Sequence, residues 1–512
     1  MQTIVNKVVI VGGGTAGWMA AASLVHQLAH LKLDITLIES SDIGTVGVGE
    51  ATVPAIRDYI ASLGLDIFDV MRATQGTAKL GIEYVGWSGE GRRFFHPFGA
   101  YGVPAGQTAF HHIWHRLREL GDDTPLAAYN LCTQLALSGR FMPPPAKPRA
   151  AFEAYDWAIH FDAGLFGRYL REFATQRGVK RIDAKVIDAV VDEQSQITHV
   201  RLDSDLSVDG DLFIDCSGFR GLLIQGALHS GYQNWKKWLP CDRAVALPCA
   251  FAPSAQDSAQ EADVRAGMTP YTRATALAAG WSWRIPLQHR IGNGYVYSSD
   301  HISDDEAETV LRARLEGEVL GNANRLRFTS GHATEVWKGN CIALGLAAGF
   351  LEPLESTSIV LVQTGIEKLI RLFPYAGFSA VTRTEFNRCT RLEYERIRDF
   401  LILHYWASAR SEPMWRACQE AELPDPLRHK IEVFRAQGHL VRYEWESFHD
   451  PSWLSMYAGL GIAARSRDLS ADRLEPDQLR NIAERLRTDV TTLANQAYLH
   501  GNYIKRVLED SK

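Results

Sequence analysis

Glycines and one acid near the start of the sequence form a pattern that binds dinucleotides. The run Gly12-x-Gly14-x-x-Gly17 follows four apolar residues, and Glu39 ends the next apolar run, 22 residues beyond Gly17. In this pattern the glycines allow a tight turn and close approach of the pyrophosphate, and the acid holds the adenosine ribose. A lone glycine-rich loop would be a weak signal, but strand, glycines, helix, strand and acid follow in register. Because Glu39 would repel a 2′-phosphate, we favour FAD or NAD over NADP.

Two later segments favour FAD over NAD. Residues 211–218 and 341–349 each form an apolar run that ends in small residues, which let a flat ring system approach the backbone. Three such strand ends spread along the chain are typical of the flavin monooxygenase architecture. The alternative is that the two later segments are ordinary core strands.

Lys79 begins a segment of alternating polarity. Leu80, Ile82 and Tyr84 would lie on one face of a strand, and Lys79, Glu83 and Trp87 on the other. Taken alone, Lys79 is more simply a solvated charge. The functional interpretation is a donor or amine nucleophile, a role open to a desolvated lysine.

Tryptophans alternate in a second segment, Gly280–Pro286. Trp281, Trp283 and Ile285 would share one face, with the two indoles stacked side by side. A hydrophobic core strand is the simpler explanation of this pattern.

Glu355 stands just before a run with helical spacing, and Ser356 is a candidate N-cap. Acidic and hydroxyl side chains are favoured at the start of any helix, so helix capping alone would explain Glu355 and Ser356. The functional alternative is that the first N–H groups of this helix bind a small anion.

A histidine-rich segment and a glycine-rich loop complete the candidates. His111, His112 and His115 have the spacing of metal ligands on a helix, but no acid completes the set, and we expect no metal. Gly44, Gly47 and Gly49 indicate a mobile loop that could lie against a cofactor.

The composition is that of a globular protein. The 512-residue chain is 46% apolar and 22% charged and holds 13 tryptophans, which disfavours disorder. Seven dispersed cysteines without a Cys-x-x-Cys pair disfavour a disulfide scaffold or a zinc motif. A net charge of −6 gives no reason to expect nucleic acid.

No segment indicates a membrane. Residues 8–25 are uncharged and could imitate a signal peptide, but consecutive glycines at positions 12–14 would break its helix. The next apolar run, residues 342–351, is too short to span a bilayer. We expect a cytoplasmic protein.

Taken together, these segments resemble the flavin-dependent tryptophan halogenases. The resemblance covers most of the chain and is strongest over residues 5–120 and 275–370. Its most specific motif is Gly-Trp-x-Trp-x-Ile-Pro, which flavin hydroxylases lack and which Gly280–Pro286 matches in full. Lys79 matches the essential lysine of the family, and Glu355 matches its active-site glutamate. Trp281 and Trp283 would then shield the active site.

The resemblance implies a reaction and its partners. FADH2 from a separate NAD(P)H-dependent flavin reductase reacts with O2, and chloride or bromide is converted to hypohalous acid. This reagent travels to Lys79, which presents an electrophilic halogen to a small aromatic substrate. Glu355 helps to polarise the reagent or removes the ring proton.

The resemblance also assigns binding residues. Thr357 and Ser358 would bind halide through backbone amides, although Ser358 replaces an expected glycine. The FAD contacts would be Gly12, Gly13, Gly14, Thr15, Ala16, Gly17, Glu39, Gly49, Glu50, Leu346 and Ile359.

The residues that bind substrate in this family are matched less fully in this sequence than those that bind FAD. His96, Pro97 and Phe98 match the residues that sandwich indole, Trp453 matches a pocket wall, and Tyr443 lies where the amino-acid head group is held. Phe448 replaces the glutamate that would bind the substrate ammonium, with Glu446 and Asp450 nearby. A buried ammonium without a counter-charge is costly. We therefore favour free indole or a simple derivative over free tryptophan.

The predicted fold class is α/β with α+β lobes. A flavin monooxygenase-like FAD lobe with a Rossmann-type βαβ unit would span residues 1–360, with substrate-region insertions near 90–150. A mainly helical lobe, 361–512, would cover the substrate. The protein would be a monomer or a homodimer. The alternatives are a flavin-dependent aromatic hydroxylase, a tryptophan halogenase proper, and a flavin-binding redox sensor or carrier without turnover.

Overall fold

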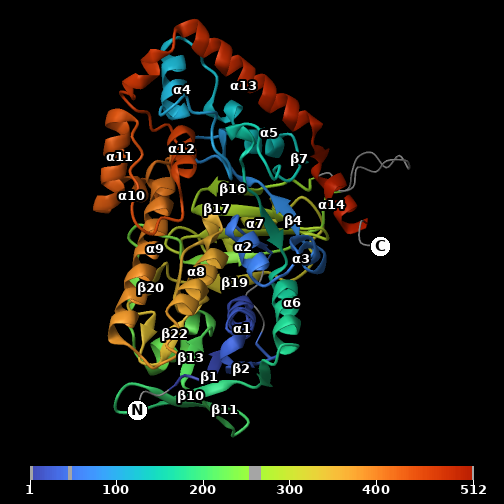
Figure 1. Ribbon diagram of the computed structural model, residues 1–512, viewed down its shortest axis with the longest axis vertical. Coiled ribbons are helices and arrows are strands. Elements are labelled where there is room, and N and C mark those ends of the chain that lie inside the picture. The colour runs from blue at the N-terminus through green and yellow to red at the C-terminus, as the bar shows by residue number, and fades with distance from the viewer. Residues whose placement is uncertain (1–3, 44–48, 253–266, 510–512) are drawn as a thin grey trace. The chain divides into compact units, whose positions relative to one another are not determined.

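The computed structural model describes residues 4–43, 49–252 and 267–509 (Figure 1). Gly44 and Gly47 of the predicted cofactor loop lie outside the described residues. In these ranges, no helix combines the length and the apolar character that crossing a bilayer requires. The chain forms two compact units, the first from Met1–Gly76, Phe161–Lys236 and Arg327–Glu395, the second from Thr77–His160, Lys237–Leu326 and Arg396–Lys512.

These units interleave along the chain because strands distant in sequence pair within each of them. The functional division predicted near residue 360 stays a prediction. That position lies inside a helix of the first unit, α8 (Thr357–Arg371). Helices dominate the C-terminal segment as expected: α10 (Pro413–Glu420), α11 (Asp425–Gln437), α12 (Asp450–Gly459), α13 (Pro476–Gln496) and α14 (His500–Glu509).

A mainly parallel sheet forms the centre of the first unit. Its six strands lie in the order β21 (Trp337–Lys338), β22 (Cys341–Ala343), β13 (Leu212–Asp215), β1 (Lys7–Val11), β2 (Asp34–Glu39) and β9 (Lys180–Asp183). Residues 8–11 are buried, as befits a strand with parallel partners on both sides. The predicted strands near residues 8, 35, 212 and 341 are thus confirmed, and all four lie next to one another in this sheet.

Helices flank this sheet. Helix α1 (Thr15–Gln27) packs against α6 (Ala163–Thr175) and α8. It begins at Thr15, within the glycine pattern itself. A Cβ atom on Gly17 would lie 1.9 Å from the Gly12 carbonyl oxygen, and Gly12 has φ of +111°. The structure therefore confirms the predicted tight turn at Gly12, and it also shows close helix–strand packing at Gly17.

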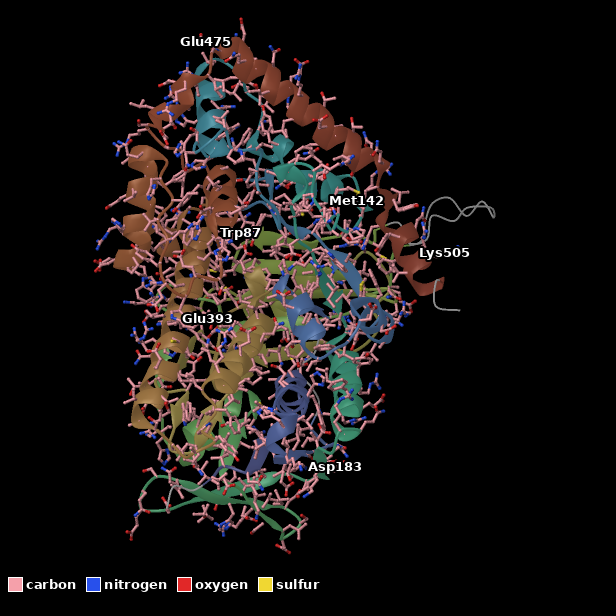
Figure 2. All side chains as sticks on the ribbon, in the orientation of Figure 1. Trp87, Met142, Asp183, Glu393, Glu475 and Lys505 are labelled. Atoms are coloured by element: carbon pink, nitrogen blue, oxygen red, sulfur yellow. The ribbon has the colours of Figure 1, made fainter. Side chains whose placement is uncertain are left out.

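A buried ion pair joins two helices of the first unit. Lys368 Nζ on α8 lies 2.5 Å from Glu393 Oε2 on α9 (Ala380–Trp406), where Figure 2 labels Glu393. The remaining elements of this unit are β3 (Glu50–Ala51), α2 (Ala55–Ser62), α3 (Ile67–Ala73), β10 (Val186–Val191), β11 (Ile197–Leu202), β12 (Ser207–Asp209), β14 (Tyr232–Asn234), β20 (Gly331–Ala333) and β23 (Gly349–Phe350).

A seven-stranded sheet forms the centre of the second unit. Its order is β19 (Asn324–Arg327), β15 (Arg243–Ala246), β18 (Ile291–Tyr297), β17 (Gly280–Pro286), β16 (Thr272–Leu277), β5 (Gly81–Val85) and β6 (Arg93–Pro97). Smaller elements complete the unit: β4 (Thr77–Lys79), β8 (Ala158–Phe161), β7 (Arg140–Phe141), β24 (Tyr498–Leu499), α4 (Phe110–Glu119), α5 (Leu131–Leu137) and α7 (Asp304–Arg312).

The segment that begins at Lys79 is not one continuous strand. Strand β4 ends at Lys79, and β5 begins at Gly81 in a different sheet. Between them, the Leu80 N–H donates to the Pro270 carbonyl over 2.7 Å, so the chain changes sheets at Leu80. The predicted shared face of Lys79, Glu83 and Trp87 is therefore wrong.

Glu83 and Trp87 have structural partners. Glu83 accepts from Arg273 Nε at 2.6 Å and from Arg93 at 3.1 Å, so two guanidinium groups neutralise this buried carboxylate. Trp87 (Figure 2) donates its indole N–H to the Ala274 carbonyl over 3.1 Å. Glu83 and Trp87 therefore bind partners on β16 and β6 rather than sharing a strand face with Lys79.

Replacing Gly17 should disturb the packing of helix α1 against the glycine turn at Gly12. We expect Gly17→Ala to lower the free energy of unfolding by about 1–3 kcal/mol, because its Cβ would overlap the Gly12 carbonyl. Gly14→Ala is the matched control, since its Cβ meets no atom within 4 Å. Thermal unfolding of the FAD-free proteins measures the difference. Equal melting temperatures for the two variants would refute the packing role of Gly17.

Candidate active site

Glu39 lies against the glycine turn in the first unit. The Trp18 indole N–H donates to Glu39 Oε2 over 3.2 Å, and Arg181 Nε donates to Oε1 over 2.5 Å. A Cβ atom on Gly13 would lie 1.6 Å from the same carboxylate, so only glycine fits there. Trp18 and Arg181, which sequence reasoning missed, thus hold Glu39 at the end of β2.

The three predicted strand ends meet at one edge of the sheet. Because β1, β13 and β22 are parallel neighbours, their carboxyl ends lie together, which is where open α/β sheets bind ligands. A Cβ atom on Gly345 would come within 2.8 Å of Ala16 Cβ, so the turn that holds Leu346 lies against the start of α1. The space beside Gly14 is open. These features fit a dinucleotide such as FAD.

Asp215, at the end of β13, binds backbone N–H groups of the turn that follows it. It is fully buried and accepts the backbone N–H groups of Ser217, Leu223 and Ile224 at 2.8–3.0 Å. Burial raises the pKa of its carboxyl. Asp215 therefore fixes the turn after β13.

The predicted loop residues Gly49 and Glu50 lie at the start of β3. Gly49 is buried, with φ of +34°. Burial raises the pKa of the Glu50 carboxyl to about 7. A carboxyl of this kind can change charge near neutral pH, which matters if it lies against a cofactor.

Helix α8 begins at Thr357, one residue after the predicted N-cap. Ser356 occupies the N-cap position with a left-handed backbone, φ of +60°, but its side chain makes no capping hydrogen bond. The first N–H groups of the helix are therefore not capped by that hydroxyl. Glu355 is buried in the short 3-10 turn Pro353–Glu355 that precedes it, and Ile359 is buried in the first turn of α8.

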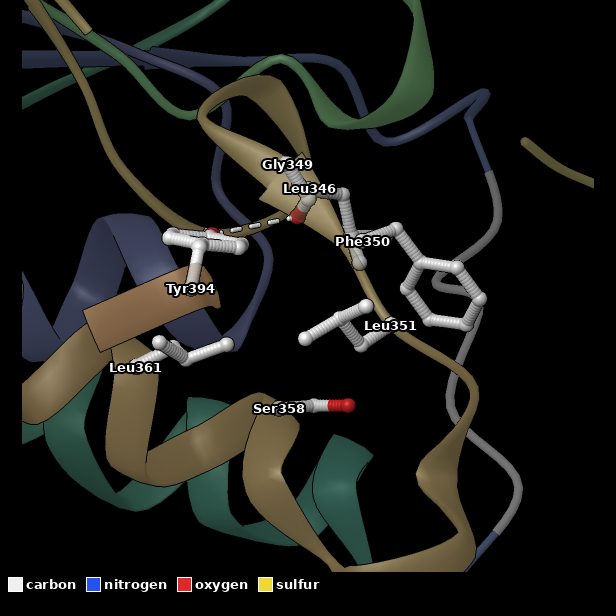
Figure 3. Close-up of a pocket in the computed structure, with 8 residues that line it drawn as sticks. Leu346, Gly349, Phe350, Leu351, Ser358, Leu361 and Tyr394 are labelled. Atoms are coloured by element: carbon white, nitrogen blue, oxygen red, sulfur yellow. Dashed lines mark hydrogen bonds between the residues drawn. The ribbon is translucent and has the colours of Figure 1, made fainter. Parts of the chain in front are cut away.

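A small apolar hollow lies beside this helix start (Figure 3). Its volume is about 10 Å³, and it is lined by Gly345, Leu346, Gly349, Phe350, Leu351, Ser358, Leu361 and Tyr394. Figure 3 shows Ser358 and Leu361 on α8, with the Tyr394 hydroxyl donating to the Gly349 carbonyl over 3.3 Å. The Thr357 hydroxyl is buried, with no hydrogen-bond partner among the described residues. The predicted residues Leu346 and Ser358 thus line the same hollow.

In the second unit, Lys79 is fully buried. It ends β4, which pairs antiparallel with β8, and its side chain has no exposed surface. Its ammonium lies 5.2 Å from the centre of the Phe98 ring, within cation–π distance. The interpretation of Lys79 as a solvated charge is therefore wrong.

The predicted substrate residues His96, Phe448 and Trp453 meet around Phe400. Phe448 stacks on Phe400 at 4.0 Å between ring centres, and Trp453 meets the same ring edge-on at 5.0 Å. His96 lies 5.9 Å from Phe400 and 6.3 Å from Phe448. Phe400, on α9, was missed because its helical position shows only that it is buried. Pro97 ends β6 and pairs with Gly81, which follows Lys79 by two residues in the sequence.

A buried ion pair lies next to this aromatic cluster. Lys430 Nζ is 2.7 Å from Glu446 Oε1, and both side chains are less than one-tenth exposed. The same ammonium lies 4.5 Å from the Trp453 ring centre and 5.0 Å from that of Tyr443. Burial lowers the pKa of Lys430, and Glu446 opposes that shift. Sequence reasoning did not find Lys430, because nothing local marks its partner.

Trp281 and Trp283 are buried on β17, but their rings are not stacked. The ring centres are 6.2 Å apart, and the planes are inclined by 56°. Trp283 lies over Gly294 of β18, where a Cβ atom would be 2.0 Å from the indole. The predicted shared face is confirmed, whereas the predicted stacking is wrong, because Gly294 gives one indole room to lie across the neighbouring strand.

The histidines of α4 contact backbone groups. His111 Nε2 lies 2.9 Å from the Gly438 carbonyl oxygen, and His115 Nε2 lies 3.1 Å from that of Ala464. The Asp468 N–H donates to His112 Nδ1 over 3.3 Å. Among residues 4–43, 49–252 and 267–509, no group of three or more His, Cys, Asp or Glu has a geometry that could hold a metal.

Comparison with known proteins decides the family. The tryptophan halogenase family model matches residues 7–476. The chain belongs to the tryptophan halogenase family. It is 36% identical over 451 residues to tryptophan 6-halogenase SttH of Streptomyces toxytricini, with 84% of each chain covered.

Solved structures of flavin-dependent halogenases agree with this assignment. BrvH from Brevundimonas sp. BAL3 superposes with a TM-score of 0.93 at 44% identity, covering 98% of this chain and 99% of its own. Xcc4156 from Xanthomonas campestris gives a TM-score of 0.92 at 40% identity, covering 99% of both chains. The halogenase thus has the predicted α/β fold, and its activity is flavin-dependent halogenation.

The Lys430–Glu446 pair of this halogenase should stabilise its substrate region. We expect Glu446→Gln to lower the free energy of unfolding by about 3–5 kcal/mol, because it leaves the buried Lys430 ammonium without its counter-charge. Thermal unfolding measures the loss. Glu444→Gln is the control, since Glu444 is exposed two residues away. A loss from Glu446→Gln no larger than that of the control would contradict the pairing.

Proposed function

We propose that this halogenase installs chlorine or bromine on free indole or a simple indole derivative, using FADH2, O2 and halide. The observation that carries the choice of substrate is the state of the charges around Phe448. A free amino acid would bring an ammonium group into this region, and that group would need a buried counter-charge.

Both acids near Phe448 already have cationic partners. Glu446 pairs with Lys430, and Asp450 accepts from Arg442 through two hydrogen bonds of 2.8 and 2.5 Å. Lys430 is itself a buried cation beside Trp453, so a substrate ammonium near it would be repelled. A neutral indole avoids the cost and can use the aromatic surfaces of His96, Phe448 and Trp453.

Free tryptophan is the second candidate. It is favoured by relatives whose names describe tryptophan 6-halogenases and tryptophan 7-halogenases. For these proteins the name states the substrate, whereas Phe448 and the paired acids favour the smaller neutral molecule in this chain. Offering indole and tryptophan separately distinguishes the two.

We propose the FAD site at the carboxyl ends of β1, β13 and β22. Gly12, Gly13 and Gly14 with the start of α1 would hold the pyrophosphate, and Glu39 would hold the ribose. Gly49, Glu50, Leu346 and Ile359 would lie along the remainder of the cofactor. Bound reduced FAD would supply two electrons that bring O2 to the peroxide level, and halide would give up two further electrons to become hypohalous acid. Because the chain carries one dinucleotide pattern, which is assigned to FAD, a separate NAD(P)H-dependent reductase would supply FADH2.

The halide would be held by the uncapped N–H groups of Thr357 and Ser358. Backbone donors at a helix start suit an anion without requiring a cationic side chain. Lys79 would hold the hypohalous acid by a hydrogen bond or as a haloamine, and Glu355 would act as charge partner or base. The complete burial of its side-chain nitrogen, which removes competing water, suits Lys79 to this role.

Product identity tests the proposed activity. The halogenase is incubated with FAD, a flavin reductase, NADH, O2 and bromide or chloride, with indole and tryptophan in separate reactions. We expect a halogen isotope pattern on indole by mass spectrometry, at a rate above that on tryptophan. A product that gains only oxygen would indicate a hydroxylase instead, and FAD oxidation without any product would indicate a redox carrier.

Substituting Lys79 tests its role. We expect Lys79→Ala to reduce halogenated product by at least about 10²-fold, the scale of losing a positioned catalytic group, while FAD binding is retained. The control is Lys236→Ala, which removes a lysine from the first unit. Undiminished halogenation by Lys79→Ala would remove the assigned role.

A further inference from the structure

A chain of buried hydrogen bonds connects four strands around Lys79 in the second unit. His160 on β8 has no exposed surface, and its two ring nitrogens each contact a threonine hydroxyl. Nδ1 lies 3.0 Å from Thr77 Oγ1 on β4, and Nε2 lies 3.0 Å from Thr272 Oγ1 on β16. The Thr77 hydroxyl also contacts the Pro286 carbonyl oxygen at the end of β17, over 2.7 Å.

The hydrogen bonds of this chain fix the tautomer of His160. A hydroxyl has one proton to donate, and a carbonyl can only accept, so the Thr77 proton goes to Pro286. Thr77 Oγ1 must then accept a proton from Nδ1, and Nε2 is left to accept from Thr272. His160 is therefore the neutral Nδ1–H tautomer, with both ring nitrogens satisfied.

This chain acts on the strand that carries Lys79. In the register of β4 with β8, Thr77 faces His160 and Lys79 faces Ala158, so Thr77 and Lys79 point to the same side of their strand. The backbone on either side of Lys79 is also bound. The Ala78 N–H donates to His500 Nε2 over 3.2 Å, and the Leu80 N–H donates to Pro270.

The charge state of the two histidines suits a buried ammonium. Burial, followed by the charge of Lys79, lowers the pKa of His160 well below its usual range. Burial also lowers the pKa of His500 to about 4. Both imidazoles are thus neutral near pH 7, and neither adds a second positive charge beside Lys79.

We propose that His160 is a positioning residue for Lys79, acting through the chain Thr272–His160–Thr77–Pro286. The chain ties the lysine strand β4 to the end of the Gly-Trp-x-Trp-x-Ile-Pro strand β17. This inference rests on the proposed role of Lys79 in halogen transfer. Transfer needs the amine at a fixed place, because a displacement of about 1 Å can cost roughly a hundredfold in rate.

The test removes one hydroxyl from the chain while keeping the shape of the side chain. Thr77→Val loses the bonds to His160 and Pro286, whereas Thr77→Ser keeps a hydroxyl. Both variants are assayed with FAD, reductase, NADH, O2, bromide and indole, in the presence of a soluble trap for hypobromous acid. We expect Thr77→Val to lower the ratio of bromoindole to trapped reagent by roughly tenfold or more. Thr77→Ser should restore most of that ratio.

A spectroscopic readout separates positioning from general damage. In protein labelled with ¹⁵N-histidine, the signals that His160→Gln removes should show one protonated and one unprotonated ring nitrogen. In Thr77→Val these signals should shift, and in Thr77→Ser they should not. If Thr77→Val fails to fold, Thr272→Val against Thr272→Ser tests the other end of the chain in the same way.

The outcomes separate the two proposals. An unchanged bromoindole ratio in Thr77→Val and Thr272→Val overturns the positioning role, as does an equal loss in the valine and serine variants. If Lys79→Ala brominates indole like the wild type, the proposed role of Lys79 fails instead. If Lys79→Ala is inactive while Thr77→Val is fully active, only the inference about His160 fails.

Discussion

The complete burial of the Lys79 ammonium is the constraint on which the second unit depends. A buried charge is unfavourable unless its surroundings compensate for it, and the cost grows if the neighbours are also positive. The face of the Phe98 ring lies within cation–π distance, and the nearest histidine on the paired strand is neutral. The change of sheet at Leu80 places Lys79 in a different sheet from Glu83, whose carboxylate is neutralised by two arginines.

The first unit handles charge in a different way. The proposed anion-binding positions are backbone N–H groups at the starts of α1 and α8, and the residues before these helices leave those groups uncapped by side chains. Glycine is required where backbone meets backbone, as at Gly12 and Gly17, or where it meets a carboxylate, as at Gly13. Sites of this kind would bind negative groups without adding mobile cations.

Local patterns in the sequence predicted much of this structure, since their physical causes are local. The glycine turn, Glu39 and the alternating strand of Trp281 and Trp283 each follow from spacing along a single segment. The change of sheet at Leu80 was not predictable, because the carbonyl that accepts the Leu80 N–H belongs to Pro270, far away in sequence. Spacing also could not show that Gly294 lets Trp283 tilt away from Trp281.

Buried polar partners were the main features that the sequence did not reveal. Lys430 and Glu446 are an ordinary helix lysine and a loop acid until the fold brings them to 2.7 Å. His160 lies in an apolar segment that reads as a core strand, and only the structure shows threonines at both of its nitrogens. Phe400 is likewise one buried helix residue among many until Phe448 stacks on it.

The central claim is that a buried Lys79 transfers halogen before the reagent escapes to solvent. The most direct measurement is the ratio of bromoindole to hypobromous acid captured by a polymer-bound trap, which is too large to enter the protein, in wild-type enzyme at increasing trap concentration. The account predicts a ratio that reaches a plateau well above zero, because transfer occurs inside the protein. Bromoindole that falls to zero as the trap increases would contradict it, since halogenation would then take place in free solution.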